Sequence, residues 1–147
     1  MKKIAGLLAA FVAVFSLTAC GSTSNTFKCT GKIEGEDATV TGTIKGGKVT
    51  KIVAEQKKEL ESEEQAKQGA AMYNGFGSMA AESGMSMTAK ASGKTVTISI
   101  EVDVEKFVKA AKDNGEDTDD NAFGIDLSKT NKDEIVKAFE EQGLTCE

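Results

Sequence analysis

Residues 95–111 of the chain read Thr-Val-Thr-Ile-Ser-Ile-Glu-Val-Asp-Val-Glu-Lys-Phe-Val-Lys-Ala-Ala. Apolar and polar residues alternate as far as Asp103, which is typical of a β-strand with one buried face and one solvated face. After Asp103 the apolar residues recur at i, i+3, i+4 and i+7, which predicts an amphipathic helix capped by Asp103. A strand that leads directly into a helix favours a mixed α and β fold.

Other strand patterns predict that the sheet is antiparallel. Strand-like runs upstream cover residues 27–34, 38–45 and 48–55. Gly46-Gly47 joins the last two runs and predicts a tight hairpin, because both central residues of such a turn need a positive φ. Residues 85–91 are expected to pair with residues 94–103 in a second hairpin, across a turn at Ser92-Gly93.

Two further helices are expected, and each begins with a capping box. The first starts at Ser62 and ends at Ser83-Gly84, and the second starts at Asn131 and ends at Gly143. The apolar stripe expected on the first helix consists of Ala66, Ala70, Tyr73, Phe76 and Ala80. We therefore predict an α+β fold, an antiparallel sheet of about five strands with two to three helices packed on one face.

The first 19 residues are typical of a secretory signal peptide. Lys2 and Lys3 precede an apolar run from Ile4 to Leu17, which is short for a bilayer span of about 20 residues. The sequence Leu17-Thr18-Ala19-Cys20 resembles the lipobox of bacterial lipoproteins. That resemblance implies cleavage before Cys20 and a membrane anchor of diacylglycerol, with acyl chains such as palmitate, on its thiol. The alternative is a signal peptide cleaved at another bond.

The predicted mature chain is held at the extracytoplasmic face of the cell membrane. Residues 20–26 are the lipidated cysteine and a polar tether that reaches at most about 20 Å. Residues 27–147 are expected to form a single domain. Removal of Lys2 and Lys3 with the signal peptide changes the net charge from −5 to −7, and so acidic a domain is repelled by anionic headgroups, so we expect the anchor to hold it there. Every basic residue is a lysine, which favours an AT-rich genome and a Gram-positive source.

Two further cysteines, Cys29 and Cys146, lie near opposite ends of this domain. An exported compartment permits oxidation, so we expect a structural disulfide that pins the first strand to the C-terminal segment. Free thiols and a redox pair are the alternatives. Redox pairs are usually close in sequence and lie in electropositive settings, and this pair has neither feature.

Composition argues against several classes of function. A net charge of −5 is unsuited to binding nucleic acid, because neutralising phosphates needs a basic surface. The chain has no histidine, which excludes Ser-His-Asp and Cys-His catalysis and histidine-containing zinc sites. We predict that the protein is not an enzyme and needs no cofactor, with a carboxylate-based hydrolase as a less favoured alternative.

An acidic loop keeps metal binding open as an alternative. Asp117, Asp119 and Asn121 have the spacing of the first three ligands of a calcium-binding loop. Ala122 stands where that loop needs glycine, and Ser128 stands where it needs a bidentate glutamate. An EF-hand is therefore rejected, and a solvated acidic loop is favoured over a looser oxygen site.

A group of methionines offers a second possible metal site. Its members are Met72, Met79, Met85 and Met87. Thioethers are soft ligands that suit copper(I), but methionines also fill cores and line adaptable partner surfaces. We favour packing in the core, with a partner-facing surface as the next interpretation.

Over nearly its whole length the chain resembles the YehR-like bacterial lipoproteins, a family of small proteins of unknown function. The resemblance is carried by the lipobox and tether, the hairpin Gly46-Gly47-Lys48-Val49, the strand from Thr95 to Val102 and the closing helix from Asn131 to Gly143. It implies a compact α+β lipoprotein domain and no particular activity. No functional residue is carried over except Cys20.

These observations predict a membrane-anchored lipoprotein that acts as a non-catalytic binding or accessory module of the cell envelope. Its expected partners are the membrane, through the lipid anchor, and an envelope protein or small ligand held on the sheet or on the glycine-bearing helix. The alternative is a metal-binding lipoprotein that uses the acidic loop or the methionines.

Overall fold

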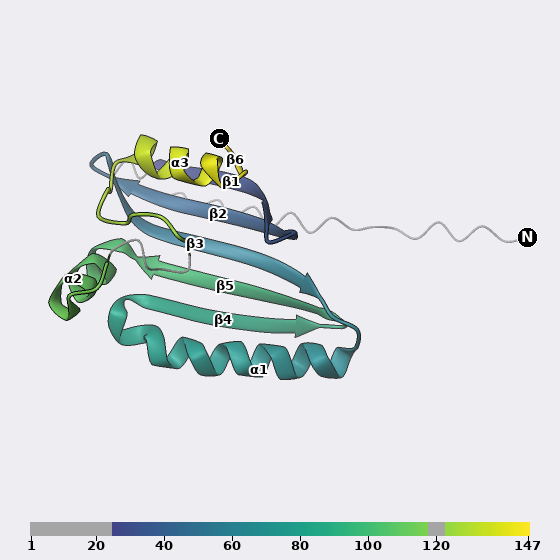
Figure 1. The fold of residues 1–147 in the computed structure, drawn as a ribbon. Coiled ribbons are helices and arrows are strands. Elements are labelled where there is room, and N and C mark those ends of the chain that lie inside the picture. The colour runs from purple at the N-terminus through teal and green to yellow at the C-terminus, as the bar shows by residue number, and fades with distance from the viewer. Residues whose placement is uncertain (1–24, 118–122) are drawn as a thin grey trace, which may run out of the picture.

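In the computed structural model, residues 25–117 and 123–147 are described, and they form one open sheet with three α-helices (Figure 1). The strands are β1 (Asn25–Ile33), β2 (Glu36–Lys45), β3 (Lys48–Glu59), β4 (Met85–Ser92), β5 (Thr95–Asp103) and β6 (Thr145–Cys146). The helices are α1 (Glu63–Ala80), the short 3-10 helix η1 (Ala81–Ser83), α2 (Val104–Asn114) and α3 (Lys132–Glu141). The predicted α+β class is confirmed.

The strands pair antiparallel in the order β4-β5-β3-β2-β1-β6. We expected about five strands, and the part of the chain that the structure describes has six. The additional strand is β6, in which Thr145 and Cys146 pair with Thr30 and Cys29 of β1. The disulfide predicted between Cys29 and Cys146 had already indicated that the C-terminal segment lies beside the first strand, although two residues are too few to show an alternating pattern.

The glycine pair between β2 and β3 forms the predicted tight turn. Gly46 and Gly47 have φ values of 57° and 78°, which suit glycine because it has no Cβ. The turn between β1 and β2 lies at Glu34 and Gly35, slightly earlier than the turn expected at residues 35–37. Both turns are short, so β1, β2 and β3 form a continuous antiparallel meander.

Alternation along the strands sorts the side chains onto two faces of the sheet. On one face the register aligns Gly42, Ile52 and Val102, and the last two are completely buried. The other face carries mainly threonine, serine, lysine and glutamate, including Thr41 and Glu101. The hydrophobic core therefore lies against the first face.

The main core joins this face to α2, α3 and the segment that precedes α3. The ring centroid of Phe139 in α3 lies 6.4 Å from that of Phe27 in β1 and 6.1 Å from that of Phe123. Gly42 makes room for this packing, because a Cβ at that position would overlap the ring of Phe27. Since burying a phenylalanine side chain contributes roughly 1.5–3 kcal/mol, these rings contribute strongly to stability.

A second apolar cluster joins α1 to β4 and β5. Its buried members are Ala66, Ala70, Ala89, Val96 and Ile98. Gly77 brings the helix still closer, because a Cβ there would overlap the backbone of Met87 in β4. Phe76 was expected on this packed side, but it is exposed, because it lies on the side of the helix that faces away from the cluster.

Asn74 of α1 covers the outer edge of β4. Its side-chain amide donates to the carbonyl oxygen of Ala89 at 3.0 Å, and its Oδ1 accepts from the Ala89 backbone N at 2.8 Å. In the described sheet β4 is the last strand on this side, and Figure 1 shows α1 running alongside it. Because unpaired strand edges promote aggregation, we infer that α1 protects this edge.

Polar side chains begin the helices as predicted. An oxygen of Ser62, Asp103 and Asn131 accepts from a first-turn backbone N–H of α1, α2 and α3 at 3.2, 3.1 and 2.9 Å, respectively. Gly84 and Gly115 follow η1 and α2 with φ values of 78° and 70°. These residues satisfy backbone groups that a helix leaves unpaired at its ends.

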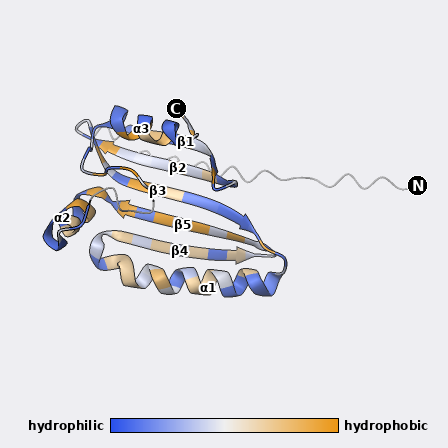
Figure 2. Cartoon of the chain, viewed as in Figure 1, coloured by the Kyte–Doolittle hydropathy of each residue, from blue (hydrophilic) through white to orange (hydrophobic). Residues whose placement is uncertain are grey.

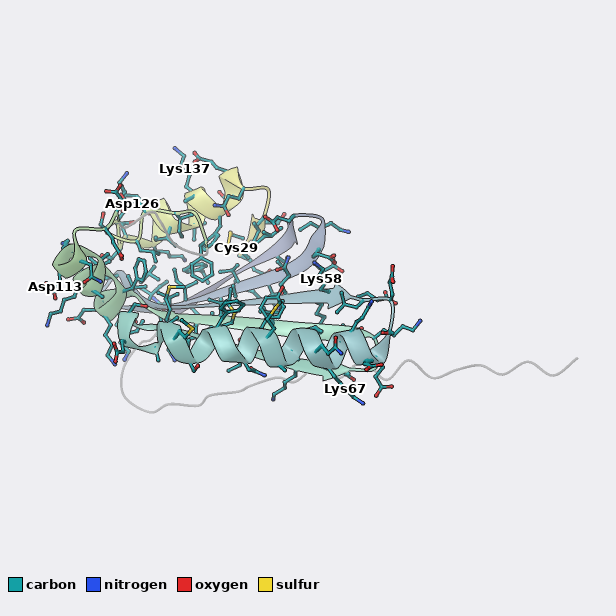
Figure 3. All side chains as sticks on the ribbon, turned by 60° about the horizontal axis from the view of Figure 1, so that its bottom comes forward. Cys29, Lys58, Lys67, Asp113, Asp126 and Lys137 are labelled. Carbon is teal, nitrogen blue, oxygen red and sulfur yellow. A yellow bond between two sulfur atoms is a disulfide. The ribbon has the colours of Figure 1, made fainter. Side chains whose placement is uncertain are left out.

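A disulfide joins β1 to the C-terminal segment, as predicted. Cys29 and Cys146 face each other in register, and their Cα atoms are 4.0 Å apart. Beside them, Lys28 N donates to Glu147 O at 3.0 Å, and Glu147 N donates to Lys28 O at 2.9 Å. In Figure 3 Cys29 lies inside the molecule, whereas the Lys67 side chain points outward from its helix.

Candidate functional site

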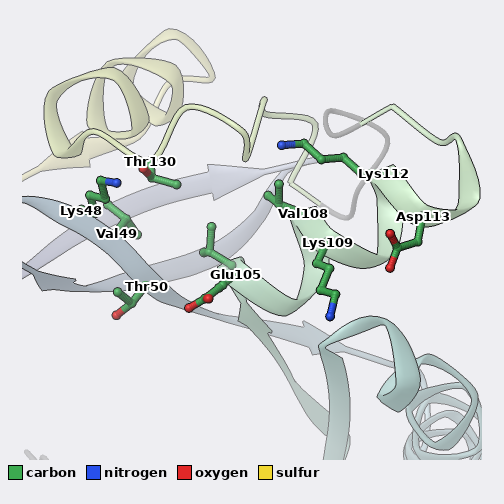
Figure 4. Close-up of a pocket in the computed structure, with 10 residues that line it drawn as sticks. Lys48, Val49, Thr50, Glu105, Val108, Lys109, Lys112, Asp113 and Thr130 are labelled. Atoms are coloured by element: carbon green, nitrogen blue, oxygen red, sulfur yellow. The ribbon is translucent and has the colours of Figure 1, made fainter.

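A cleft of about 570 Å³ opens between the start of β3, α2 and the segment that precedes α3 (Figure 4). The turn at Gly46 and Gly47 places Lys48 and Val49 at this end of the sheet. Val49 N donates to Thr130 O at 2.7 Å, and this hydrogen bond holds the segment that precedes α3 beside β3. The volume falls in the range of about 300–1,000 Å³ that is usual for small-molecule sites.

Three valines form the apolar part of the lining. They are Val49, Val104 and Val108. Val49 and Val104 belong to the main core and are almost completely buried, whereas Val108 is half-buried and packs against that core. Val108 is therefore the valine of the lining that offers exposed surface to an apolar group.

Charged side chains line the rest of the cleft. Lys48 comes from β3, Lys109 and Lys112 come from α2, and the carboxylates of Glu105 and Asp113 belong to the same helix. Figure 4 shows the Lys48 and Lys112 side chains on opposite sides of the cleft, with Val108 next to Lys112. Lysine ammonium groups donate hydrogen bonds to phosphate or carboxylate oxygens. The lining thus combines a partly exposed valine with lysines that can bind an anionic group.

Sequence reasoning missed this cleft because its residues come from three separate segments. One signal was present, because Val104, Val108 and Lys112 recur every four residues and so share one side of α2. The sequence contains no comparable signal that β3 and Thr130 lie opposite this side. That arrangement comes from tertiary contacts such as the hydrogen bond between Val49 and Thr130.

The predicted cation-binding loop is described only in part. Asp117 follows α2 and is exposed, whereas Asp119 and Asn121 lie outside the described residues. Within residues 25–117 and 123–147, no group of three or more histidine, cysteine, aspartate or glutamate residues is placed to hold a metal ion. The loop as a cation site stays a prediction.

The methionines separate into two pairs, which corrects the expectation that all four fill the core. Met72 and Met79 lie on the outer side of α1 and are 56% and 80% exposed. Met85 and Met87 of β4 are half-buried and pack against the two core clusters. The reason is geometric: small residues of α1 approach β4, so the larger side chains of the helix face outward.

The predicted membrane anchor lies outside the described residues. This holds for the signal peptide, residues 1–19, and for Cys20. β1 begins at Asn25, so the last two residues of the expected tether, residues 20–26, belong to the first strand. Among the helices of the described part, none is both long and apolar enough to cross a membrane.

One carboxyl group in α1 has a shifted pKa. Lys67 Nζ lies 2.8 Å from Glu63 Oε1, one helical turn away. The hydrogen bond from Lys67 and its positive charge lower the pKa of Glu63 below its usual value. Both side chains are largely exposed, so this pair supports the first turn of α1 and is remote from the cleft.

The fold and the cleft define a small α+β domain built on an open antiparallel sheet. A solved structure with this fold is the NMR structure of the E. coli YehR protein, which matches with a TM-score of 0.62 and 17% sequence identity. The match covers 86% of this chain and 92% of YehR. The chain therefore has a YehR-like fold.

A second NMR structure, of a protein from Streptococcus pneumoniae TIGR4, matches with a TM-score of 0.46 and 14% identity. That match covers 100% of this chain and 98% of the streptococcal chain. No protein-family model matches the sequence, and no curated protein matches it.

Proposed function

We propose that this protein is a lipoprotein, anchored through Cys20 to the extracytoplasmic face of the cell membrane, and that it acts as a non-catalytic binding module. The positively charged start, the short apolar run and the lipobox before Cys20 support the anchor. In this proposal the helices cover one face of the sheet, and the cleft between β3 and α2 is the ligand site.

The cleft is the observation that carries the binding function. The half-buried Val108 lines the same cleft as Lys48 and Lys112, which fits a small anionic amphiphile. Such a ligand joins a phosphate or carboxylate group to a short apolar chain. The lysines bind the anionic group through charge-assisted hydrogen bonds, and the exposed surface of Val108 removes part of the chain from water.

Mass spectrometry of the chain purified from the membranes of its own bacterium tests the anchor, with Cys20→Ala as the matched variant. We expect the original chain to begin at a Cys20 that carries diacylglycerol, and the variant to carry no lipid. Cleavage at another bond with an unmodified Cys20 contradicts the anchor.

Calorimetric titration with hexyl phosphate tests the ligand site. Inorganic phosphate probes the binding of the anionic group alone, and hexanol probes the binding of the apolar chain alone. We expect hexyl phosphate to bind more tightly than either. Lys48→Met combined with Lys112→Met should weaken its binding about tenfold, a loss of about 1.4 kcal/mol.

The control for this titration is Lys90→Met, because Lys90 is an exposed lysine of β4 that does not line the cleft. This variant should bind hexyl phosphate as the original chain does. Equal affinity for all three probes, or an equal loss in Lys90→Met, contradicts the assignment of the cleft. Either result leaves the anchor untouched.

A further inference from the structure

The large apolar side chains that are exposed in the described part of the chain lie together on α1. Met72, Phe76 and Met79 are 56%, 56% and 80% exposed. Their spacing of four and three residues places them on one side of the helix, away from the buried Ala70 and Gly77. These three residues are called the α1 stripe below.

The outer side of α1 changes in character along the helix. Near its start this side carries Gln65 and Gln68, which are exposed, and the first turn is acidic. The α1 stripe occupies the C-terminal half, and Figure 2 shows the helix changing from hydrophilic to more hydrophobic in that direction. Exposed apolar residues that gather in one place mark a contact surface, unlike single scattered ones.

The C-terminal end of α1 lies at the end of the sheet where the described chain begins. Asn25 starts β1 opposite Ile44, and the register across the sheet aligns this end with Asp103 of β5 and Met85 of β4. α1 and η1 finish directly before Met85 (Figure 1). The start of β1 and the C-terminal end of α1 therefore lie at one end of the sheet, on opposite edges that are about 19 Å apart from β1 to β4.

We infer that the α1 stripe docks on the bilayer surface to which the chain is anchored. This inference rests on the proposed anchor at Cys20. Asn25 is five residues beyond Cys20, so the tether reaches at most about 18 Å and keeps this end of the domain at the membrane. Met79 lies near the end of α1, and Phe76 lies about one turn before it.

A second copy of the chain fits the α1 stripe less well than a bilayer does. Stable protein interfaces take roughly 20–30 residues a side, and the stripe is three residues on one helix. Shallow insertion at a membrane surface needs only a few apolar side chains, and flexible methionines adapt to irregular surroundings.

The test uses the full lipidated chain in vesicles of phosphatidylglycerol and phosphatidylcholine, with phosphatidylcholine brominated near the top of its acyl chains as the quencher. The chain has no tryptophan, so Phe76→Trp supplies a reporter within the stripe. Gln65→Trp is the matched control, because Gln65 is exposed near the other end of the same helix.

We expect Phe76→Trp to lose about half of its emission on brominated vesicles, because an interfacial helix lies about 5–10 Å into the headgroup boundary. Gln65→Trp should lose none.

Equal quenching of the two lipidated variants, or none in either, overturns the docking and leaves the anchor in place. A chain that mass spectrometry shows to lack diacylglycerol overturns both the anchor and the docking. A blue shift of Phe76→Trp with protein concentration, without vesicles, assigns the stripe to a second copy and overturns the inference.

Discussion

At the scale of single residues, Gly42 decides how tightly the sheet packs beneath α3. The ring of Phe27 occupies the space that a Cβ at position 42 would take. Gly42→Ala should lower the free energy of unfolding by about 1–3 kcal/mol, because overpacking forces side chains or backbone to shift. Urea denaturation followed by circular dichroism measures this, and an unchanged midpoint would show that the ring has room to move.

A second residue-scale prediction concerns Asn74, which no sequence pattern identified. Its amide forms two hydrogen bonds with the backbone of Ala89 at the edge of β4. Asn74→Ala should cost about 1–3 kcal/mol, because both backbone groups lose their partner. Thermal denaturation measures the loss, and light scattering measures any association through the exposed edge. Gln68→Ala, an exposed change on the same helix, is the control and should leave both unchanged.

At the scale of elements, α1 carries two glycines whose replacement should have opposite effects. Nothing lies within 4 Å of a Cβ built on Gly75, whereas one on Gly77 would overlap the Met87 backbone. Gly75→Ala should stabilise the protein by about 0.5–1 kcal/mol, because alanine is the better helix former. Gly77→Ala should destabilise it, because the helix must move away from β4. Guanidinium denaturation of both variants tests the pair, and a shift of the same sign in both contradicts the packing of α1.

The predictions for individual elements depended on local rules, and most of them are confirmed for that reason. Asp103 was expected to end a strand and cap a helix, and its carboxylate does accept from Lys106 N at 3.1 Å. Gly46 and Gly47 were expected to form a turn and do so. The prediction of the apolar side of α1 was wrong at Phe76, because helix periodicity does not show how closely the neighbouring strand approaches.

At the scale of the whole molecule, the disulfide links the first strand to the last residues. Cys29 and Cys146 are 117 residues apart in sequence. Closing a loop of this length restricts the unfolded chain, so its loss should cost about 4–5 kcal/mol. Guanidinium denaturation with and without reductant measures the cost. In a variant with both Cys29→Ala and Cys146→Ala, reductant should have no further effect; an effect there would assign the change to another cause.

The sequence alone determined the properties that depend on neighbours along the chain. These are the strand and helix periods, the capping residues, the glycine turns and the likeness of residues 17–20 to a lipobox. It also narrowed the chemistry, because a chain without histidine lacks the commonest general base. Each of these follows from the period of a strand or helix, or from the chemistry of single residues.

Only the tertiary structure decided which segments meet. It placed Lys48 and Lys112 in the lining of one cleft and turned Met72, Phe76 and Met79 outward. The physical reason is that a helix period defines a face but not its neighbour. The neighbour is set by the order of strands in the sheet and by where glycines and alanines allow close approach, and both depend on residues far apart in the chain.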